Sequence, residues 1–260
     1  MNTPSQTYYK LNQDSSNIVD SYSFNNYEVT IRTNQEEGGM VYNIQYDSLT
    51  SSHLKDFYVF ENKIKSLLEN YILKNKEFCT FDQLYSSLSE NINQELDIPD
   101  KILVPVLLRV LNIEKIGPLL IDDQIDEVYL DSSESGIYVD HSKYGRCTTT
   151  IFLSKIEIES FVQRVALEND FSLNQANPTM KSDFVSSLFH CRVTVDIPPL
   201  IIDDIHIDIR KFHSHRLRLS DLIKIGSITE KQVAFLIYMI QNQVSIVAGL
   251  VSFCALILRH

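Results

Sequence analysis

Apolar and polar residues alternate early in the chain, in the pattern of half-buried β-strands. Residues 22–47 follow this alternation on both sides of a turn signal at Gly38-Gly39. Apolar residues then recur every three or four positions, which predicts helices over 53–75, 80–91 and 100–112. Pro105 is expected to interrupt or kink the last of these helices, because proline cannot donate the helical hydrogen bond. Residues 1–20 are polar and are expected to be disordered.

The hydrophobic pattern changes after Gly117-Pro118, a pair that is expected to break the regular structure. Shorter apolar runs follow, and they predict strands over 125–130, 136–140, 147–152, 186–195 and 201–210. Side chains alternate across a strand, so the last strand has two distinct faces. One face is expected to carry Ile205, Ile207 and Ile209, and the other His206, Asp208 and Arg210.

Two capping boxes mark the starts of further helices. Ser154 with Glu157 predicts a helix that follows the third of these strands. Thr229 with Gln232 predicts a helix over 230–242. Strands and helices therefore occur throughout, and the predicted fold class is α+β.

Composition and charge narrow the functional classes. The chain of 260 residues has 23 basic and 34 acidic residues, a net charge of −11, which argues against a nucleic-acid partner. The four cysteines are far apart in sequence, so buried thiols in a reducing cytoplasm are expected rather than a zinc ribbon or disulfides. The apolar run 244–258 is shorter than the roughly 20 residues of a spanning helix, which leaves a tail anchor as an alternative.

Several segments, taken together in their order and spacing, resemble the amino-terminal region of archaeal secretion-system ATPases. These are the type II/type IV secretion ATPases that drive archaella and pili. The segments that carry the resemblance are 117–131, 137–145, 191–194, 207–212 and 219–229. The helical stretch 53–75 also resembles the family, more weakly. With it, the resemblance covers roughly residues 40–249.

The resemblance implies a division of the chain into five parts. They are a partly disordered segment 1–40, a strand-plus-helix subdomain 41–115, a small α/β domain 116–212, a linker 213–229, and the beginning of a RecA-like domain at 230–260. In the family, ATP and magnesium lie between the amino-terminal and RecA-like domains of a hexameric ring. The ring acts on a membrane platform protein, so a cytoplasmic location, with peripheral binding at the inner face of the membrane, is implied.

The last residues of the sequence bear on the predicted activity. Residues 244–249 resemble the strand that leads into a phosphate-binding loop, with Gly249 at the approach to that loop. No Gly-Lys-Ser or Gly-Lys-Thr follows. The expectation is therefore a truncated motor ATPase that lacks this loop, holds neither ATP nor magnesium tightly, and has no catalytic residue of its own. The alternative is a stand-alone adaptor that binds a full-length motor ATPase or its platform.

The resemblance implies that Arg192 and Arg210 contact the phosphates of a nucleotide. A guanidinium group is always charged and can hold two phosphate oxygens at once. The alternative is that Arg210 only pairs with Asp208 or Asp196. The turns that normally precede these two arginines in the family differ here, at residues 188–190 and 203–204.

Two groups of residues have side chains of the types that bind metal ions. The acidic run Asp122, Asp123, Asp126, Glu127 and Asp131 lacks the spacing of a calcium loop, and a solvated turn before a strand is the simpler interpretation. His213 and His215, with His206 nearby, could ligate zinc, although their basic neighbours favour surface histidines. No metal site is therefore expected.

Overall fold

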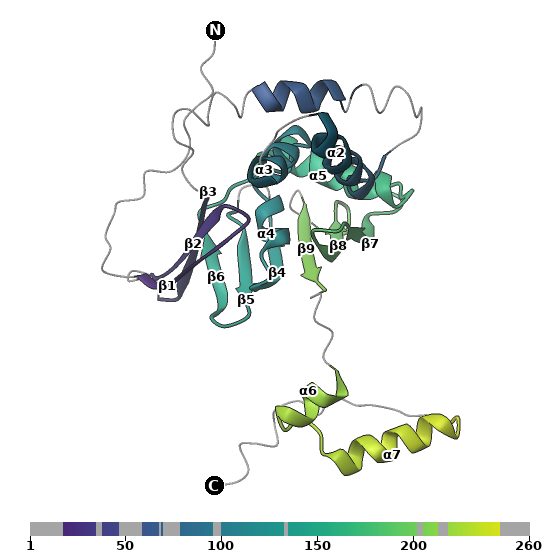
Figure 1. The fold of residues 1–260 in the computed structure, drawn as a ribbon. Helices are drawn as coiled ribbons and strands as arrows, with labels where there is room; N and C mark the ends of the chain where they lie inside the picture. Colours follow the sequence, from purple (N-terminus) through teal and green to yellow (C-terminus); the bar gives the residue numbers. More distant parts are fainter. Residues whose placement is uncertain are drawn as a thin grey trace. The chain divides into compact units, whose positions relative to one another are not determined.

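The computed structural model describes most of the chain and divides it into two compact units, 1–213 and 214–260. Its described residues are 18–34, 38–46, 59–67, 69, 79–95, 100–132, 135–201, 205–212 and 218–244. The first unit combines one large mixed sheet with helices (Figure 1). The α+β class predicted from the sequence is confirmed.

The sheet has nine strands in the order β1-β2-β3-β6-β5-β4-β9-β8-β7. The strands are β1 (Ile18–Phe24), β2 (Tyr27–Thr33), β3 (Met40–Tyr46), β4 (Ile125–Leu130), β5 (Tyr138–His141), β6 (Gly145–Thr149), β7 (Thr179–Val185), β8 (His190–Asp196) and β9 (His206–Lys211). All neighbouring strands are antiparallel except β3 and β6, which are parallel and place Met40 opposite Cys147. This pairing joins the amino-terminal hairpins to the later strands in one sheet.

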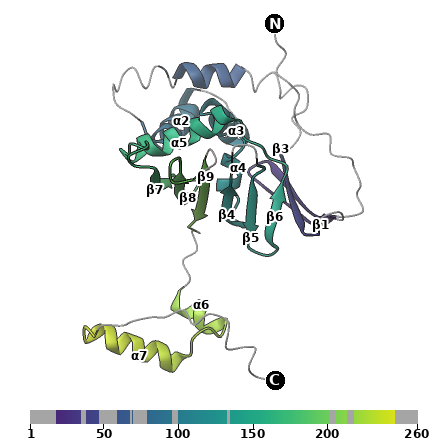
Figure 2. The same cartoon turned by 180° about the vertical axis from the view of Figure 1, so that it is seen from behind.

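Helices lie together along one side of the sheet, as both ribbon views show (Figures 1 and 2). They are α2 (Phe81–Glu95), α3 (Asp100–Val110), α4 (Gly117–Ile121) and α5 (Lys155–Glu168), and residues 59–67 are also helical. Their apolar faces and the inward side chains of the strands share one core. The Phe184 ring of β7 lies 5.9 Å from Phe81 and 6.0 Å from Phe161, and burial of such aromatic surface holds α2 and α5 on the sheet.

Most predicted elements are present, and the exceptions have physical causes. The Ser154 capping box is formed at the start of α5. Pro105 does not interrupt α3, whose buried residues on either side, Val104 and Val106, keep the segment in the core. Gly117-Pro118 starts α4 instead of breaking the structure, because proline fits the first turn of a helix.

One strand, β7, was not predicted, and another, β1, was predicted only from Tyr22 onward. β7 has buried Met180 and Phe184 on its inward face, but the polar Ser182 stands between them and weakens the alternation. β1 begins at Ile18, inside the amino-terminal segment that was expected to be disordered. Neither strand has a run of apolar residues long enough to be recognised without its partners.

The second unit contains α6 (Leu219–Lys224) and α7 (Glu230–Gln241). The Thr229 capping box is formed at the start of α7, as predicted. The segment 213–229 was expected to be a linker, but it includes the short helix α6. This helix is followed by a turn at Gly226, where φ is +74°. Across the described residues, every helix is too short or too polar to cross a membrane. Gly249 lies outside the described residues.

Candidate functional site

The strands β8 and β9 each have one buried face and one face toward solvent. Ile207 and Ile209 are buried, whereas Arg210 is on the opposite face, so the predicted alternation of β9 is confirmed. In β8, Cys191 and Val193 are buried and Arg192 points outward between them. The helices cover the buried face, and we call the other side the outer face of the sheet.

Arg192 and Arg210 are direct cross-strand neighbours on the outer face. Side chains in such a position have Cβ atoms about 5 Å apart, so two positive charges are held close together. Like charges in this position are destabilising unless an anion compensates them. The Arg192 side chain is 43% exposed and that of Arg210 is 72% exposed, so both guanidinium groups can be reached from solvent.

Each arginine has one carboxylate partner on the adjacent strand. The Arg192 Nε donates a hydrogen bond of 2.9 Å to Asp183 Oδ1 of β7. The Arg210 Nε lies 3.5 Å from Glu127 Oε1 of β4, a carboxylate that was not considered as its partner from the sequence. The hydrogen bond from Arg192 holds the pKa of Asp183 below its usual value, because it stabilises the charged carboxylate.

An aromatic residue and a histidine border this arginine pair. The Phe212 ring centroid lies 5.2 Å from the Arg192 guanidinium carbon, within cation–π range. His190 lies beside the same ring, with centroids 4.7 Å apart, and its Nε2 is 3.8 Å from Asp183 Oδ2. The Arg192 side chain is therefore fixed on two sides.

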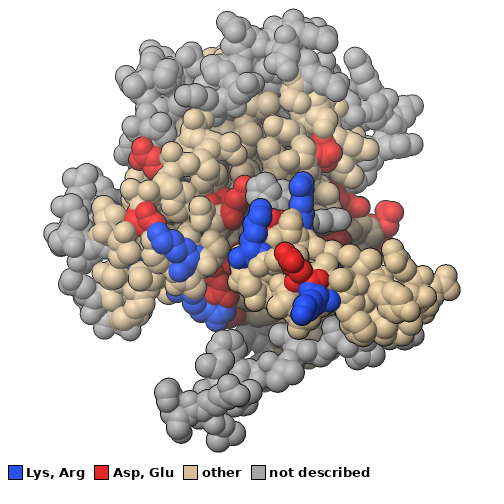
Figure 3. Space-filling view, turned by 60° about the horizontal axis from the view of Figure 1, so that its bottom comes forward, with Lys and Arg blue, Asp and Glu red and all other residues tan. Residues whose placement is uncertain are grey.

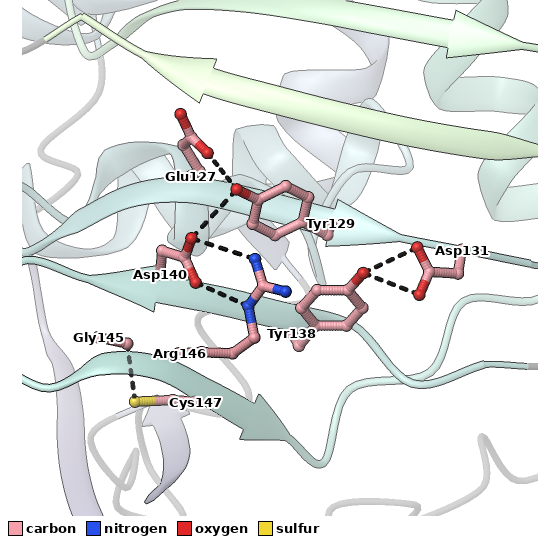
Figure 4. Close-up of polar contacts among 8 residues, drawn as sticks. All are labelled: Glu127, Tyr129, Asp131, Tyr138, Asp140, Gly145, Arg146 and Cys147. Carbon is pink, nitrogen blue, oxygen red and sulfur yellow. Dashed lines mark hydrogen bonds and ion pairs between the residues drawn. The ribbon is translucent and has the colours of Figure 1, made fainter. Parts of the chain in front are cut away.

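The row of charges continues across the sheet on strands β4, β5 and β6. Glu127 lies opposite Asp140, and Asp140 lies opposite Arg146. Arg146 donates to both Asp140 oxygens, at 2.9 and 3.3 Å (Figure 4). The Tyr129 hydroxyl lies between the two carboxylates, in hydrogen-bond contact with Glu127 and 3.1 Å from Asp140.

A pair of tyrosines stabilises this second half of the row. Tyr129 and Tyr138 are stacked at 5.1 Å, and the Arg146 guanidinium carbon lies 4.7 and 4.9 Å from their ring centroids. Burial and the hydrogen bond to Asp131 raise the pKa of Tyr138 to about 12. On the described part of the face that Figure 3 shows, Lys and Arg side chains lie among Asp and Glu side chains, so its charge is mixed.

A buried polar network lies beneath this sheet and was not predicted. Asp122, expected in a solvated turn, is only 1% exposed. The hydroxyls of Tyr22 and Tyr42 both donate to its Oδ2, at 2.6 and 2.7 Å. The Gln124 backbone N–H donates to its Oδ1 at 2.9 Å, so both carboxylate oxygens are satisfied. The solvated interpretation is therefore wrong for Asp122.

Lys211 and His141 complete the network. Lys211 Nζ donates to the backbone carbonyls of Leu119 and Asp122, and burial lowers its pKa to about 8. His141 Nδ1 accepts a hydrogen bond from the Lys143 backbone N–H, and burial lowers the pKa of this imidazole. A sequence signal existed for Lys211 alone, since it continues the inward spacing of the β9 isoleucines.

The residues considered for metal binding are not brought together within the described part of the chain. His206 lies 3.6 Å from Asp131 on the outer face, while His213 and His215 fall outside the described residues. Among the described residues, the His, Cys, Asp and Glu side chains form no group of three that could hold a metal ion.

Comparisons with known proteins give distant matches. No family model matches the chain. An uncharacterised protein of Methanocaldococcus jannaschii is 23% identical over 229 residues, which make up 84% of this chain and 30% of that protein.

Two solved structures are similar to part of this chain. The VirB11 ATPase of the Brucella suis type IV secretion system is 18% identical with a TM-score of 0.38, over 51% of this chain and 41% of that one. The Legionella pneumophila ATPase DotB is 14% identical with a TM-score of 0.31, over 50% of this chain and 34% of that one. The match thus spans less than half of each of these two chains.

Proposed function

We propose that the first unit is the amino-terminal, nucleotide-facing domain of a secretion-type or pilus-type motor ATPase. The observation that carries this proposal is the pairing of Arg192 and Arg210 on the outer face. The sequence resemblance implies a phosphate role for these two arginines, and their adjacent, solvent-accessible guanidinium groups suit that role.

The donor set matches the chemistry of a polyphosphate. Each guanidinium carries five N–H donors, of which the Nε of each arginine faces a carboxylate. The terminal nitrogens of Arg192 and Arg210 would hold phosphate oxygens of the nucleotide. A guanidinium group cannot ligate magnesium, so the arginine pair itself would supply positive charge and orientation.

The test is thermal protection of the whole chain by ATP. A ligand that binds only the folded state raises the melting temperature with concentration. Millimolar ATP is expected to raise it for the wild type and not for Arg192→Ala or Arg210→Ala. Lys143→Ala is the matched control, because it removes one surface cation and its ion pair with Asp20 but is expected to keep the protection.

Absence of any shift at millimolar ATP for the wild type would exclude a nucleotide-facing role for this chain. An equal shift in wild type and both arginine variants would locate the nucleotide elsewhere. Inorganic sulfate at the same ionic strength separates a specific triphosphate effect from general anion stabilisation.

An adaptor that binds a full-length motor ATPase is the second candidate, and helix α7 favours it. Phe235, Ile237, Tyr238 and Ile240 are all between 42% and 65% exposed on this short helix. Exposed apolar surface of this density marks interaction sites. Such a partner, or further copies of this chain in a ring at a membrane platform, would cover these side chains.

Sedimentation of the whole chain, alone and mixed with a full-length motor ATPase from the same genome, distinguishes these partners. The adaptor role predicts a mixed complex that Phe235→Ser with Tyr238→Ser weakens. Self-association without the motor would favour a ring of this chain, and a monomer that ignores the motor would contradict both.

A further inference from the structure

A single cross-strand row links the two arginines to the two carboxylates. Asp183 lies opposite Arg192, Arg192 opposite Arg210, and Arg210 opposite Glu127, on four adjacent strands. The order of charges along these positions is negative, positive, positive, negative. The quartet is therefore neutral as a whole, with its two positive charges in the middle.

The carboxylates contact the arginines at their Nε atoms. The Asp183 contact is a hydrogen bond of 2.9 Å, and the Glu127 contact is 3.5 Å. Among the described residues, no side chain bridges the terminal nitrogens of Arg192 and Arg210. The middle of the row can thus accept an anion with oxygens for both guanidinium groups, while the outer carboxylates repel that anion.

We propose that Asp183 and Glu127 are positioning residues that hold the arginine pair and weaken its affinity for a polyphosphate. This inference rests on the proposed nucleotide-facing function of the same site. Without an anion, each carboxylate neutralises one guanidinium. A triphosphate that bridges Arg192 and Arg210 must overcome the repulsion of both carboxylates, so the affinity is set by their charge.

The direction of the effect separates this role from a structural one. Asp183→Asn and Glu127→Gln keep an oxygen acceptor for the arginine Nε but remove the negative charge. Each change is expected to strengthen triphosphate binding about two- to five-fold, which is the scale of one partly exposed ion pair. If Asp183 and Glu127 only maintained the structure of the site, their substitution would instead weaken triphosphate binding.

The experiment is a titration of the whole chain with sodium triphosphate at fixed ionic strength, followed by calorimetry and by the arginine Nε–H NMR signals. Asp183→Asn, Glu127→Gln and their combination are compared with wild type. Asp196→Asn is the matched control, because it removes a carboxylate from the outer face of β8 whose hydrogen-bond partner is Thr179 rather than an arginine.

We expect Asp183→Asn and Glu127→Gln to bind triphosphate more tightly than the wild type. The affinity of Asp196→Asn should equal that of the wild type, and Arg192→Ala should not bind. Binding that is lost in Arg192→Ala but unchanged or weaker in Asp183→Asn and Glu127→Gln would overturn the positioning role and leave the proposed function standing. Equal strengthening by Asp196→Asn would also overturn it, since net charge alone would explain the gain. No binding by any variant, the combined one included, would overturn both proposals.

Discussion

The network around Asp122 and the arginine row on the outer face use the same kinds of side chain in different surroundings. Asp122 is almost fully buried and has hydrogen-bond donors on both oxygens. Arg192 and Arg210 are directly opposed on an exposed face, and each contacts one carboxylate. The carboxylate of the first region is shielded from solvent, and the guanidinium groups of the second are open to it.

The difference shows how burial decides what a polar cluster contributes. A buried charge costs free energy unless every partner is present, so the Asp122 network is tied to the stability of the fold. An exposed charge is already solvated and contributes little to stability, so the arginine row is available for a ligand. Substitutions in the two regions should therefore separate stability from binding.

The largest effect is expected from Asp122→Ala. Loss of the carboxylate leaves the hydroxyls of buried Tyr42 and half-buried Tyr22 without their acceptor, which should lower the free energy of unfolding by about 3 kcal/mol. Urea denaturation followed by circular dichroism measures the change. The neighbouring Asp123 is exposed, and Asp123→Ala is the control that should change stability little. Equal stability of the two variants would contradict the role of the network.

Lys211 gives the next largest effect, as a dependence on pH. Burial lowers its folded-state pKa to about 8, below the unfolded value, so the unfolded chain binds more protons between these two values. Stability should therefore rise with pH in this window, by about 2 kcal/mol from pH 8 to 10. The measurement is the free energy of unfolding as a function of pH for the wild type, minus the same curve for Lys211→Met. A flat difference would show that Lys211 titrates normally in the folded protein.

Tyr129→Phe is expected to have a smaller effect, of about 1 kcal/mol. It removes the hydroxyl that lies between Glu127 and Asp140 and leaves two carboxylates facing each other. Tyr138→Phe is the matched variant, because its hydroxyl contacts the exposed Asp131 and its loss should cost less. A lower denaturation midpoint for Tyr129→Phe than for Tyr138→Phe would show that the hydroxyl between the carboxylates stabilises the sheet. The reverse order would contradict this role.

The smallest change in stability is expected for Arg192→Gln. Its ion pair with Asp183 is partly exposed, so the free energy of unfolding should change by less than about 0.5 kcal/mol. The same variant should lose the ATP-dependent rise in melting temperature. A large loss of stability would mean that Arg192 belongs to the fold rather than to a ligand site.

Much of the local structure could be predicted, while the candidate site could be predicted only in part. Alternation in β9 placed Arg210 on a solvent face, and the boxes at Ser154 and Thr229 fixed the starts of α5 and α7. The phosphate role of Arg192 and Arg210 remains a prediction from resemblance. Glu127 as partner of Arg210 was not foreseen, because the sheet brings it in from a distant part of the chain.

The sequence by itself determined most of the strands and helices, since periodicity and capping depend on neighbours within a few positions. Only the tertiary structure decided which strands adjoin. That order buries Asp122 under Tyr22 and Tyr42, which are 100 and 80 residues away, and sets Arg192 opposite Arg210. Register between distant strands follows from the packing of the whole core, and no local pattern encodes it.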